Sequence, residues 1–491
     1  MVDPPEAMLA SWDQKTCCIC CIWSMPCMEA GSQVLKIVSG FIDPRLERRR
    51  SSISFMMRSC IGLMSGRPMK ARASSGVQVT STFTFMGHSV LTSLACYDPG
   101  MTTPRLAPWL AKNPRATRPL EFGREQQFVI NPNGIPELCE ELKACPAHKP
   151  TPLYELPALA ARLGVGEIRV KDESQRFGFG AFKALGGVIA VANVLTGAVG
   201  EAHHFTPSFE SVMKGGHKEI TGRFVFTAAS SGNHGRSVAA GAKLFGNRCV
   251  IFLPKFTSAE KETAIRARGA EVIRVDGDYD TAVAECRRQA ETNGWTIISD
   301  TSWEGYDSVP RSVMRGYCVL VHEAAVQQWG AAPTHVFVQA GVGGLAAAVI
   351  GYLWAVCDER PVSIVVEPES ADCWFQSNLA GQPTLASGDA DTVMGGLACR
   401  EISPVTWPII GAAADWFMTI QEDGVLPARR LYANPLGHDP AILSGPSGCA
   451  GLAGLMRVCT DAAAFKALGL GPTSRVLLIN SEGNLGEPLP S

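Results

Sequence analysis

The stretch Lys171–Gly187 holds the residues of this chain best suited to covalent chemistry. Before this stretch, Glu167–Val170 alternates polar and apolar residues, as a half-buried strand does. Near its end begins an Ala-rich apolar run of helical length, Ala184–Leu195. Lys183 therefore falls close to a helix N-terminus, where the helix macrodipole destabilises a cation. Apolar neighbours add to this effect, so the amine is predicted to be a nucleophile suited to Schiff-base chemistry. A surface lysine is the alternative, and this stretch alone does not decide.

Three glycine-rich turns could bind an anion, because successive backbone N–H groups aimed along a helix N-terminus form a nest. Each could also be a tight strand–helix turn. The chain has no GxxxxGK[ST] pattern, and its Gly341–Gly344 turn is not GxGxxG, so nucleotides are disfavoured. A single phosphate on a small cofactor fits better. Together with an activated lysine, that cofactor is most simply pyridoxal 5'-phosphate. The three turns are Ser230–Gly235, Gly341–Leu345 and Ser444–Gly448.

Strand and helix patterns alternate regularly from residue 224 onward, which predicts parallel sheets with right-handed crossovers. We therefore expect an α/β fold of two doubly wound parallel-sheet domains, with the cofactor in the cleft between them. The predicted large domain comprises residues 105–223 and 306–491, with 198–222 as an insertion loop, and the small domain comprises 224–305. Strands are expected at 224–227, 249–253, 271–275, 296–299, 335–339, 362–367, 416–420 and 475–479.

Charge and cysteine usage exclude several classes of protein. A net charge of -2 argues against nucleic acid or an anionic membrane as the main partner. Beyond residue 100 the cysteines are scattered singly, so neither a zinc site nor a disulfide framework is indicated. His203, His204 and His217 could suggest a metal. We find no carboxylate or cysteine at ligand spacing, and so predict solvated histidines and no metal.

Two further stretches bear on location. Val336–Cys357 is apolar over a membrane-length span, but glycines interrupt it, so we predict a buried strand, a turn and a buried helix, and no membrane partner. Residues 1–104 are predicted to be a poorly ordered extension or sequence from a misassigned start. Their basic run Arg45–Arg50 lies too far inside the chain for an ordinary transit peptide. A cytoplasmic protein is expected, or a mitochondrial one if that run is a real targeting signal.

The lysine segment closely resembles that of the diaminopropionate ammonia-lyases, which belong to the tryptophan-synthase-β-like (fold type II) pyridoxal-phosphate enzymes. The resemblance covers roughly residues 120–491 and includes four motifs in the family's order. The lysine motif and Asp-Thr-x-Trp-Glu-Gly-Tyr are specific, whereas the glycine turns are supportive. The motifs are Lys171–Gly187, Ser231–Arg236, Asp300–Tyr306 and Gly341–Gly344.

The resemblance implies α,β-elimination of 2,3-diaminopropionate to pyruvate and two ammonia. It also implies a homodimer, which is the usual assembly of similar enzymes. Lys183 would carry the cofactor and later the α-proton, and Asp300 would lie near the substrate's amino groups as a base or proton donor. Ser481 would face the pyridine nitrogen, with Ser447 as a competing candidate; a hydroxyl there suits elimination better than transamination. The other implied cofactor-binding residues are Phe182, Asn233, Gly341, Val342, Gly343 and Gly344.

One departure from the family pattern affects stereochemistry. The family typically has an aspartate, thought to take the α-proton of the D-substrate, where this chain has Ser231. A serine is a poor base unless something activates it. We therefore expect the L-isomer to be preferred, with Lys183 as its base. The serine also resembles the L-serine and L-threonine dehydratases of the same fold, which are the nearest alternative. A non-catalytic module that binds pyridoxal phosphate is a further one.

Overall fold

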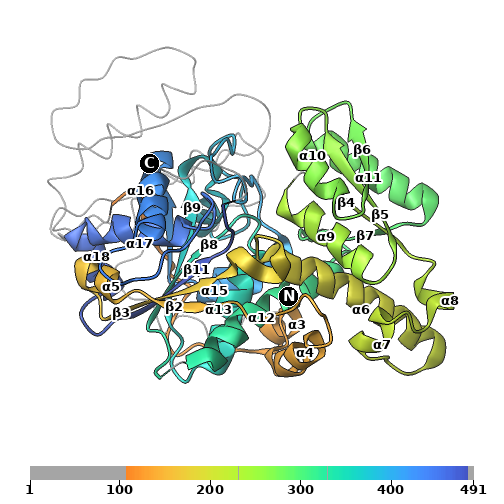
Figure 1. The fold of residues 1–491 in the computed structure, drawn as a ribbon. Coiled ribbons are helices and arrows are strands. Elements are labelled where there is room, and N and C mark those ends of the chain that lie inside the picture. Colours follow the sequence, from red (N-terminus) through yellow and green to blue (C-terminus); the bar gives the residue numbers. More distant parts are fainter. Residues whose placement is uncertain (1–106, 231, 329, 485–491) are drawn as a thin grey trace, which may run out of the picture. The chain divides into compact units, whose positions relative to one another are not determined.

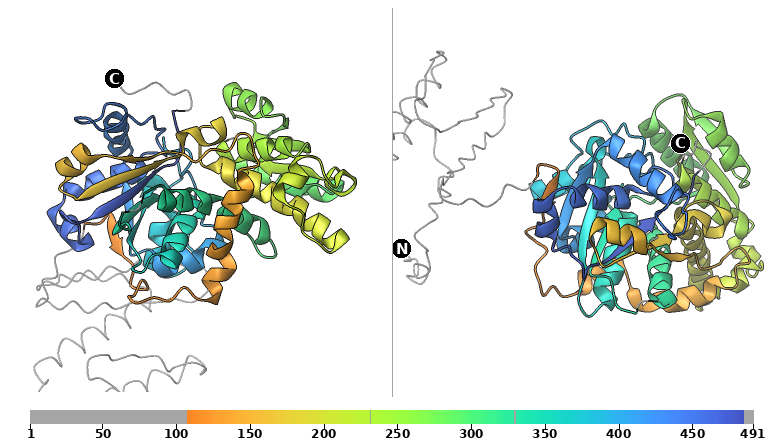
Figure 2. Two further views of the ribbon diagram at one scale, coloured as in Figure 1. Left: turned by 60° about the horizontal axis from the view of Figure 1, so that its bottom comes forward. Right: turned by 60° about the vertical axis from the view of Figure 1, so that its left-hand side comes forward.

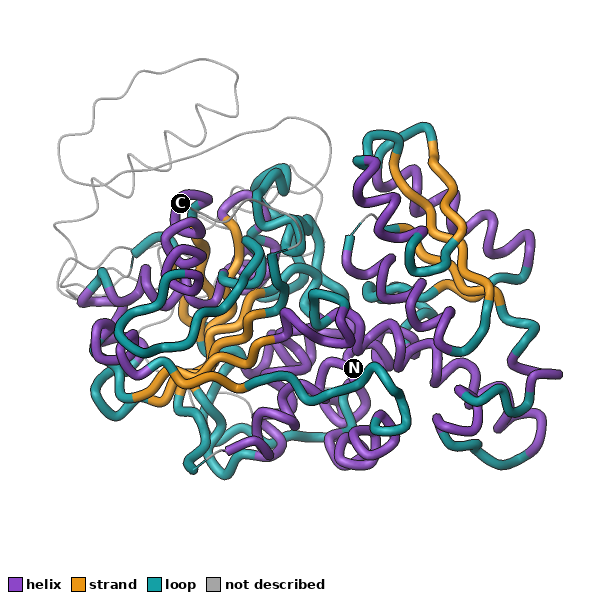
Figure 3. Tube along the Cα trace, in the orientation of Figure 1, coloured by secondary structure: helices purple, strands orange, loops and turns teal. Residues whose placement is uncertain are grey.

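The computed structural model describes residues 107–230, 232–328 and 330–484, all within one compact unit, 98–491. The prediction for residues 1–104 lies outside these ranges. The described chain builds two separate sheets, each flanked by helices (Figures 1 and 3).

The larger sheet has seven strands in the order β1-β10-β9-β8-β11-β3-β2. Its inner strands are parallel, and β1 and β2 pair antiparallel at the two edges. Neither edge strand was predicted, because three residues are too few to show a period. The strands are β1 (Leu110–Lys112), β2 (Leu153–Glu155), β3 (Glu167–Asp172), β8 (His335–Gln339), β9 (Val362–Pro368), β10 (Trp416–Ile420) and β11 (Arg475–Asn480).

Helices cover both faces of this sheet (Figure 2), and each face has its own apolar core. Successive residues of β8 divide between the two cores, since Val336 and Val338 pack on one side and Phe337 on the other. This alternation is what a strand buried on both faces requires. The helices are α3 (Arg124–Val129), α4 (Ile135–Leu142), α5 (Pro157–Leu163), α13 (Gly344–Val356), α14 (Cys373–Ala380), α15 (Trp407–Ala413), α16 (Glu422–Ala433), α17 (Ala450–Cys459) and α18 (Ala462–Leu468), together with α6 and α12 described below.

The smaller sheet is wholly parallel, in the order β6-β5-β4-β7, and all its strands come from residues 225–297. Ser258 and Asp278 cap the helices α10 and α11 by accepting a backbone N–H three residues on, as their residue types favour. The elements are β4 (Val225–Ala229), α9 (Asn233–Leu244), β5 (Arg248–Pro254), α10 (Ala259–Arg266), β6 (Glu271–Val275), α11 (Tyr279–Asn293) and β7 (Thr296–Ile297).

Helix α6 (Lys183–His203) packs against α9 on one side and against α12 (Ser308–Gln328) on the other. Two adjacent glycines permit this close approach. A Cβ atom at Gly187 would lie 2.6 Å from the backbone carbon of Ser237 in α9, and one at Gly186 would lie 2.5 Å from the Tyr317 ring in α12. The helix whose first residue is Lys183 therefore contacts α9, which packs on β4 and β5 of the smaller sheet, and α12, which contacts β3 of the larger sheet.

Of the described helices, α6 alone is long and apolar enough to cross a membrane by length and composition. Its most apolar 18-residue stretch is 61 % buried inside the protein. The stretch 336–357 instead forms β8, a glycine turn and α13, which confirms its prediction as a strand, a turn and a helix.

The prediction that 198–222 is a loop is wrong. Helix α6 continues to His203, and two short helices follow, α7 (Phe209–Met213) and α8 (Lys218–Thr221). Buried apolar side chains anchor the segment, among them Val199 and Phe209. The polar and glycine residues between them hid this pattern.

Adding a methyl group at Gly187 is predicted to destabilise the protein, because the Cβ meets backbone atoms of α9 that cannot yield. Gly187→Ala should lower the free energy of unfolding by about 1–3 kcal/mol. Gly197→Ala in the same helix is the matched control, since no atom lies within 4 Å of its Cβ position. It should be neutral or stabilise by up to about 1 kcal/mol. Thermal unfolding of both variants checks this, and equal midpoints would contradict it.

Candidate active site

Lys183 is the first residue of α6, and contacts at the strand ends fix its position. The backbone N–H of Phe182 donates to the carbonyl of Ser481, just beyond β11, at 3.0 Å. The side chain of Asn480 donates to Asp172 at the end of β3 at 2.7 Å. The lysine is thus held at the carboxyl ends of two parallel strands, where open α/β sheets place their ligands. The prediction that it begins a helix is confirmed.

Lys183, Asp300 and His234 meet in the structure. The Nζ atom of Lys183 lies 2.5 Å from Oδ2 of Asp300, and the two side chains are 19 % and 18 % exposed. Nδ1 of His234, the second residue of α9, lies 3.7 Å from the same oxygen. Nε2 of His234 lies 2.8 Å from the carbonyl of Ile298. A carbonyl only accepts, so Nε2 carries the hydrogen and Nδ1 is an acceptor, with no partner among the described residues.

The charges of this cluster are set by mutual contact. Burial alone would raise the pKa of Asp300. The charge of the His234 ring, which is present when that ring is protonated at low pH, and the Lys183 ammonium outweigh burial and hold the Asp300 pKa below its usual range. Burial lowers the pKa of His234, and the Lys183 ammonium adds to this against the opposing pull of Asp300. At neutral pH the cluster therefore holds an ionised carboxylate beside a neutral imidazole.

The prediction that the Lys183 ammonium is disfavoured is wrong for this geometry. Burial does lower the pKa of Lys183, but the Asp300 carboxylate outweighs it and raises the pKa above its ordinary value. The helix-terminus argument considered only local sequence, whereas Asp300 comes from a distant loop. Covalent attachment of a cofactor needs the neutral amine, so the Asp300 carboxylate opposes that step.

The aromatic residues of the Asp300–Tyr306 motif shape the loop that presents Asp300. The hydroxyl of Tyr306 donates to the carbonyl of Ile297 at 2.7 Å and accepts from the backbone N–H of Ser299 at 3.1 Å. The Trp303 ring stacks on Tyr306 with 3.8 Å between centroids. These contacts close the turn after β7.

The charged residues of the lysine motif lie in a buried network. Arg176 donates to Glu173 at 2.8 Å and to Glu323 of α12 at 2.6 Å, and Lys171 donates to Glu323 at 2.8 Å. The network ties the turn before Lys183 to α12. Glu323 was missed by sequence reasoning, because nothing in its local pattern signals a buried partner.

The turn Gly341–Gly344 connects β8 to α13 and fits a phosphate group. Gly343 has φ +107, and a Cβ there would lie 2.4 Å from the Trp374 ring, so only glycine is accommodated. The carbonyls of Gly341 and Val342 accept from the Trp374 indole at 3.0 Å and from the N–H of Ser403 at 2.8 Å. The first N–H groups of α13 lack partners within the helix, which is the donor set that an anion needs.

The remaining predicted cofactor residues gather around Glu482. The Asn233 amide donates to Oε2 of Glu482 at 2.9 Å, and the backbone N–H of Ser447 donates to Oε1 at 3.2 Å. The Ser481 hydroxyl accepts from Gln339 and the Ser447 hydroxyl from the N–H of Gly396, each at 2.9 Å. Each serine hydroxyl can therefore donate its O–H to another acceptor. A residue that faces a pyridine nitrogen needs such a donor.

Glu482 and His234 are the site residues that sequence reasoning missed, although both flank residues that it singled out. Phe182 packs its ring 4.6 Å from that of Tyr317 and lies beside Lys183. Ser231, the third predicted catalytic residue, lies outside the described residues.

Comparisons with known proteins agree with this geometry. Residues 144–482 match the family described as pyridoxal-phosphate dependent enzyme. The chain is 40 % identical to the diaminopropionate ammonia-lyase of Escherichia coli K12 over 346 residues, covering 69 % of this chain and 85 % of that protein.

Solved structures of that enzyme superpose on the described fold. The holo E. coli enzyme matches with a TM-score of 0.67 at 36 % identity, over 76 % of this chain and 93 % of that one. Its complex with an aminoacrylate-PLP azomethine reaction intermediate matches with a TM-score of 0.66 at 35 % identity, with the same coverage.

The family match and the solved structures define a pyridoxal-phosphate dependent enzyme of fold type II, and the lysine at a helix start and the glycine turn Gly341–Gly344 are consistent with it. Within that class, the extent and identity of the match place this chain in the diaminopropionate ammonia-lyase family.

Removing the Asp300 charge is predicted to ease attachment of the cofactor. In Asp300→Asn the lysine loses the carboxylate that raises its pKa, so the neutral amine exists at lower pH. The pH midpoint for attachment of pyridoxal phosphate to the stripped enzyme should fall by about 1–3 pH units. The visible absorbance of the attached cofactor reports this. Asp307→Asn, which removes a carboxylate paired at 3.7 Å with Arg311, is the control. An unchanged midpoint in Asp300→Asn would rule out the pairing.

Proposed function

We propose that this protein catalyses α,β-elimination of 2,3-diaminopropionate, releasing ammonia and aminoacrylate, which water converts to pyruvate and a second ammonia. The single observation that carries the proposal is the Lys183–Asp300 pair, 2.5 Å apart, in a chain of the diaminopropionate ammonia-lyase family. This pair places the amine of Lys183, a proton acceptor for the α-carbon, beside the carboxylate of Asp300, which can bind the substrate's second amine.

The residues fit pyridoxal 5'-phosphate as the cofactor. Lys183 would hold it covalently, the turn Gly341–Gly344 its phosphate, Asn233 its phenolic oxygen, and Ser481 or Ser447 its ring nitrogen. When bound, the cofactor supplies the sink for the electron pair left at the α-carbon. The protein supplies orientation and the proton transfers.

The Lys183 amine, when neutral and free of the cofactor, would be the base that takes the α-proton. Asp300 would stabilise the ammonium that results, since its carboxylate raises the pKa of Lys183. Asp300 lies beside it, and its lowered pKa keeps it ionised at neutral pH. An ionised carboxylate attracts a β-ammonium group, which already carries its proton and leaves as neutral ammonia. The acceptor atom Nδ1 of His234, 3.7 Å from Oδ2 of Asp300, adds a second contact for that group.

The same geometry disfavours the dehydratase alternative. A β-hydroxyl leaves only after protonation, and an ionised Asp300 has no proton to give. The non-catalytic alternative is disfavoured because Lys183, Asn233 and the phosphate turn are all in place.

Preference for the L-isomer is part of the proposal. It rests on Lys183 as the base and on a serine, rather than a carboxylate, at position 231. We also propose that the enzyme acts as a homodimer, as similar enzymes usually do, in the cytoplasm. The net charge of -2 supports the proposal that neither nucleic acid nor an anionic membrane is its partner.

The purified protein should release two ammonia per pyruvate from L-2,3-diaminopropionate, because both amines are lost. L-Serine would yield one ammonia per pyruvate, and its turnover should be much slower. Parallel assays of pyruvate and ammonia measure this, with Lys183→Ala as the inactive control. Faster turnover of L-serine than of the diamine would refute the assignment.

The D-isomer should be a poor substrate, because Lys183 meets the α-proton of the L-isomer. Ser231→Asp should raise kcat/KM for D-2,3-diaminopropionate by at least about tenfold, in line with the contribution of a positioned base. Turnover of the L-isomer should change little. Comparable rates for both isomers in the unmodified protein would contradict the predicted preference for the L-isomer.

A further inference from the structure

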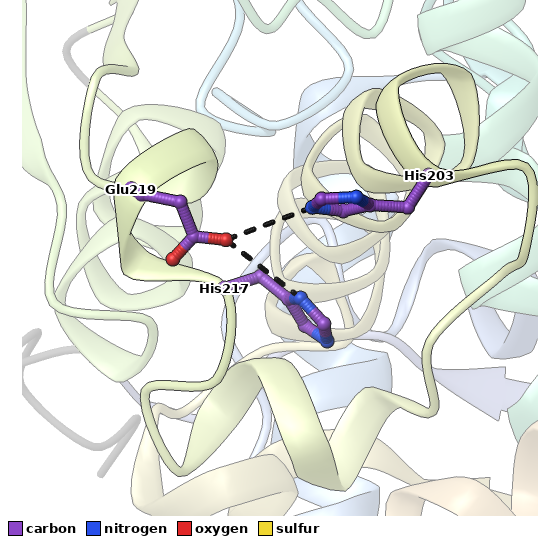
Figure 4. A group of neighbouring side chains, drawn as sticks. All are labelled: His203, His217 and Glu219. Atoms are coloured by element: carbon purple, nitrogen blue, oxygen red, sulfur yellow. Dashed lines mark ion pairs between the residues drawn. The ribbon is translucent and has the colours of Figure 1, made fainter.

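Three metal-ligating side chains converge at the far end of α6 (Figure 4). His203 is the last residue of this helix, His217 directly precedes α8, and Glu219 lies in the first turn of α8. No residue of the cluster belongs to the candidate active site. Lys183 lies at the opposite end of the 21-residue helix, about 30 Å away at 1.5 Å per residue.

The three ligand atoms face one another without bonding. Nε2 of His203 lies 3.7 Å from Oε1 of Glu219, and Nδ1 of His217 lies 3.9 Å from the same oxygen. Both distances are too long for hydrogen bonds. All three atoms lie within 4.8 Å of one another. Zinc with ligands at about 2.0–2.2 Å in a tetrahedron places its ligand atoms about 3.4 Å apart. The two pairs that include Glu219 are therefore within about 0.5 Å of that separation, and the two imidazole nitrogens must approach each other by at most about 1.4 Å.

The surroundings favour a cation. Among the described residues, Glu219 forms ion pairs with the two imidazoles and with no lysine or arginine. The ammonium of the neighbouring Lys218 is turned toward Gly246, 3.4 Å from the position of a Cβ there. His203 also lies at the C-terminus of α6, where the helix dipole is negative.

Phe205 limits the freedom of both histidines. Its ring centroid lies 6.2 Å from that of His203 and 5.5 Å from that of His217. The two imidazoles also lie close to each other, with 5.8 Å between their ring centroids. Two imidazoles and one carboxylate form a ligand set well suited to zinc.

We propose that His203, His217 and Glu219 bind one divalent transition-metal ion of the zinc type, with water completing its coordination. The ion joins the end of α6 to the start of α8 and so fixes the segment between them. The prediction of no metal overlooked Glu219, which lies two positions after His217. His203 lies fourteen positions before His217, so only the fold brings the three side chains together.

A zinc titration of the full-length enzyme loaded with pyridoxal phosphate tests the proposal, using competition with a chromophoric chelator. The unmodified protein should bind one more Zn²⁺ per chain than His217→Ala or His203→Ala. Glu219→Gln should weaken that site by more than about tenfold, since even outer-shell changes cost this much. His204→Ala, which removes an adjacent histidine outside the set, is the matched control and should bind as the unmodified protein does.

The readout is a difference between variants, because the cysteines between residues 17 and 27 could also bind zinc. Unchanged cofactor absorbance and turnover in each variant confirm that it is folded, since the site is far from Lys183. Equal stoichiometry and affinity in the unmodified protein and in both histidine variants would overturn the proposal. So would an equal loss in His204→Ala.

Discussion

The close packing of α6 between α9 and α12 is the constraint on which the site depends. Two adjacent glycines, Gly186 and Gly187, remove the side chains that would hold the neighbouring helices apart. Because Lys183 begins this helix, its backbone position follows from contacts with elements of both sheets. The glycines that follow the lysine in the motif are therefore required for packing, and through packing they place the reactive amine.

Two sets of charges act on either side of that helix start. In the segment that precedes it, Glu323 and Glu173 neutralise Arg176 and Lys171 in a buried network, which fixes the turn after β3. Breaking such a network by removing one partner leaves an uncompensated buried charge, so its members depend on one another. In the site itself, Asp300 pairs with Lys183 and remains partly exposed. The first set gives rigidity, and the second has the proton acceptor and the binding group that the proposed function needs.

Much of the fold could be predicted from the sequence because its strands and helices have strong local patterns. The strand at 335–339, the glycine turn after it and the helix start at Lys183 all follow from residue types within a few positions. The residues that were missed act over long separations. Glu323 and Glu482 carry no local signal, since their partners Arg176 and Asn233 lie in other elements. Glu219 has one partner two positions away, His217, but its other partner, His203, belongs to another helix. The same reason explains why the direction of the Lys183 pKa shift was mispredicted, since the carboxylate that raises this pKa is far from the lysine in the sequence.

The Asn233 side chain illustrates how a nearly symmetric group acquires a direction. Its amide oxygen accepts from Arg236 at 3.1 Å, while its nitrogen donates to Glu482 at 2.9 Å. A cation on one side and an anion on the other make the flipped orientation of the Asn233 amide unfavourable. The second N–H of that amide therefore points in one defined direction. An isosteric aspartate at 233 would set two carboxylates face to face. The contact that joins α9 to the end of β11 would then become a repulsion.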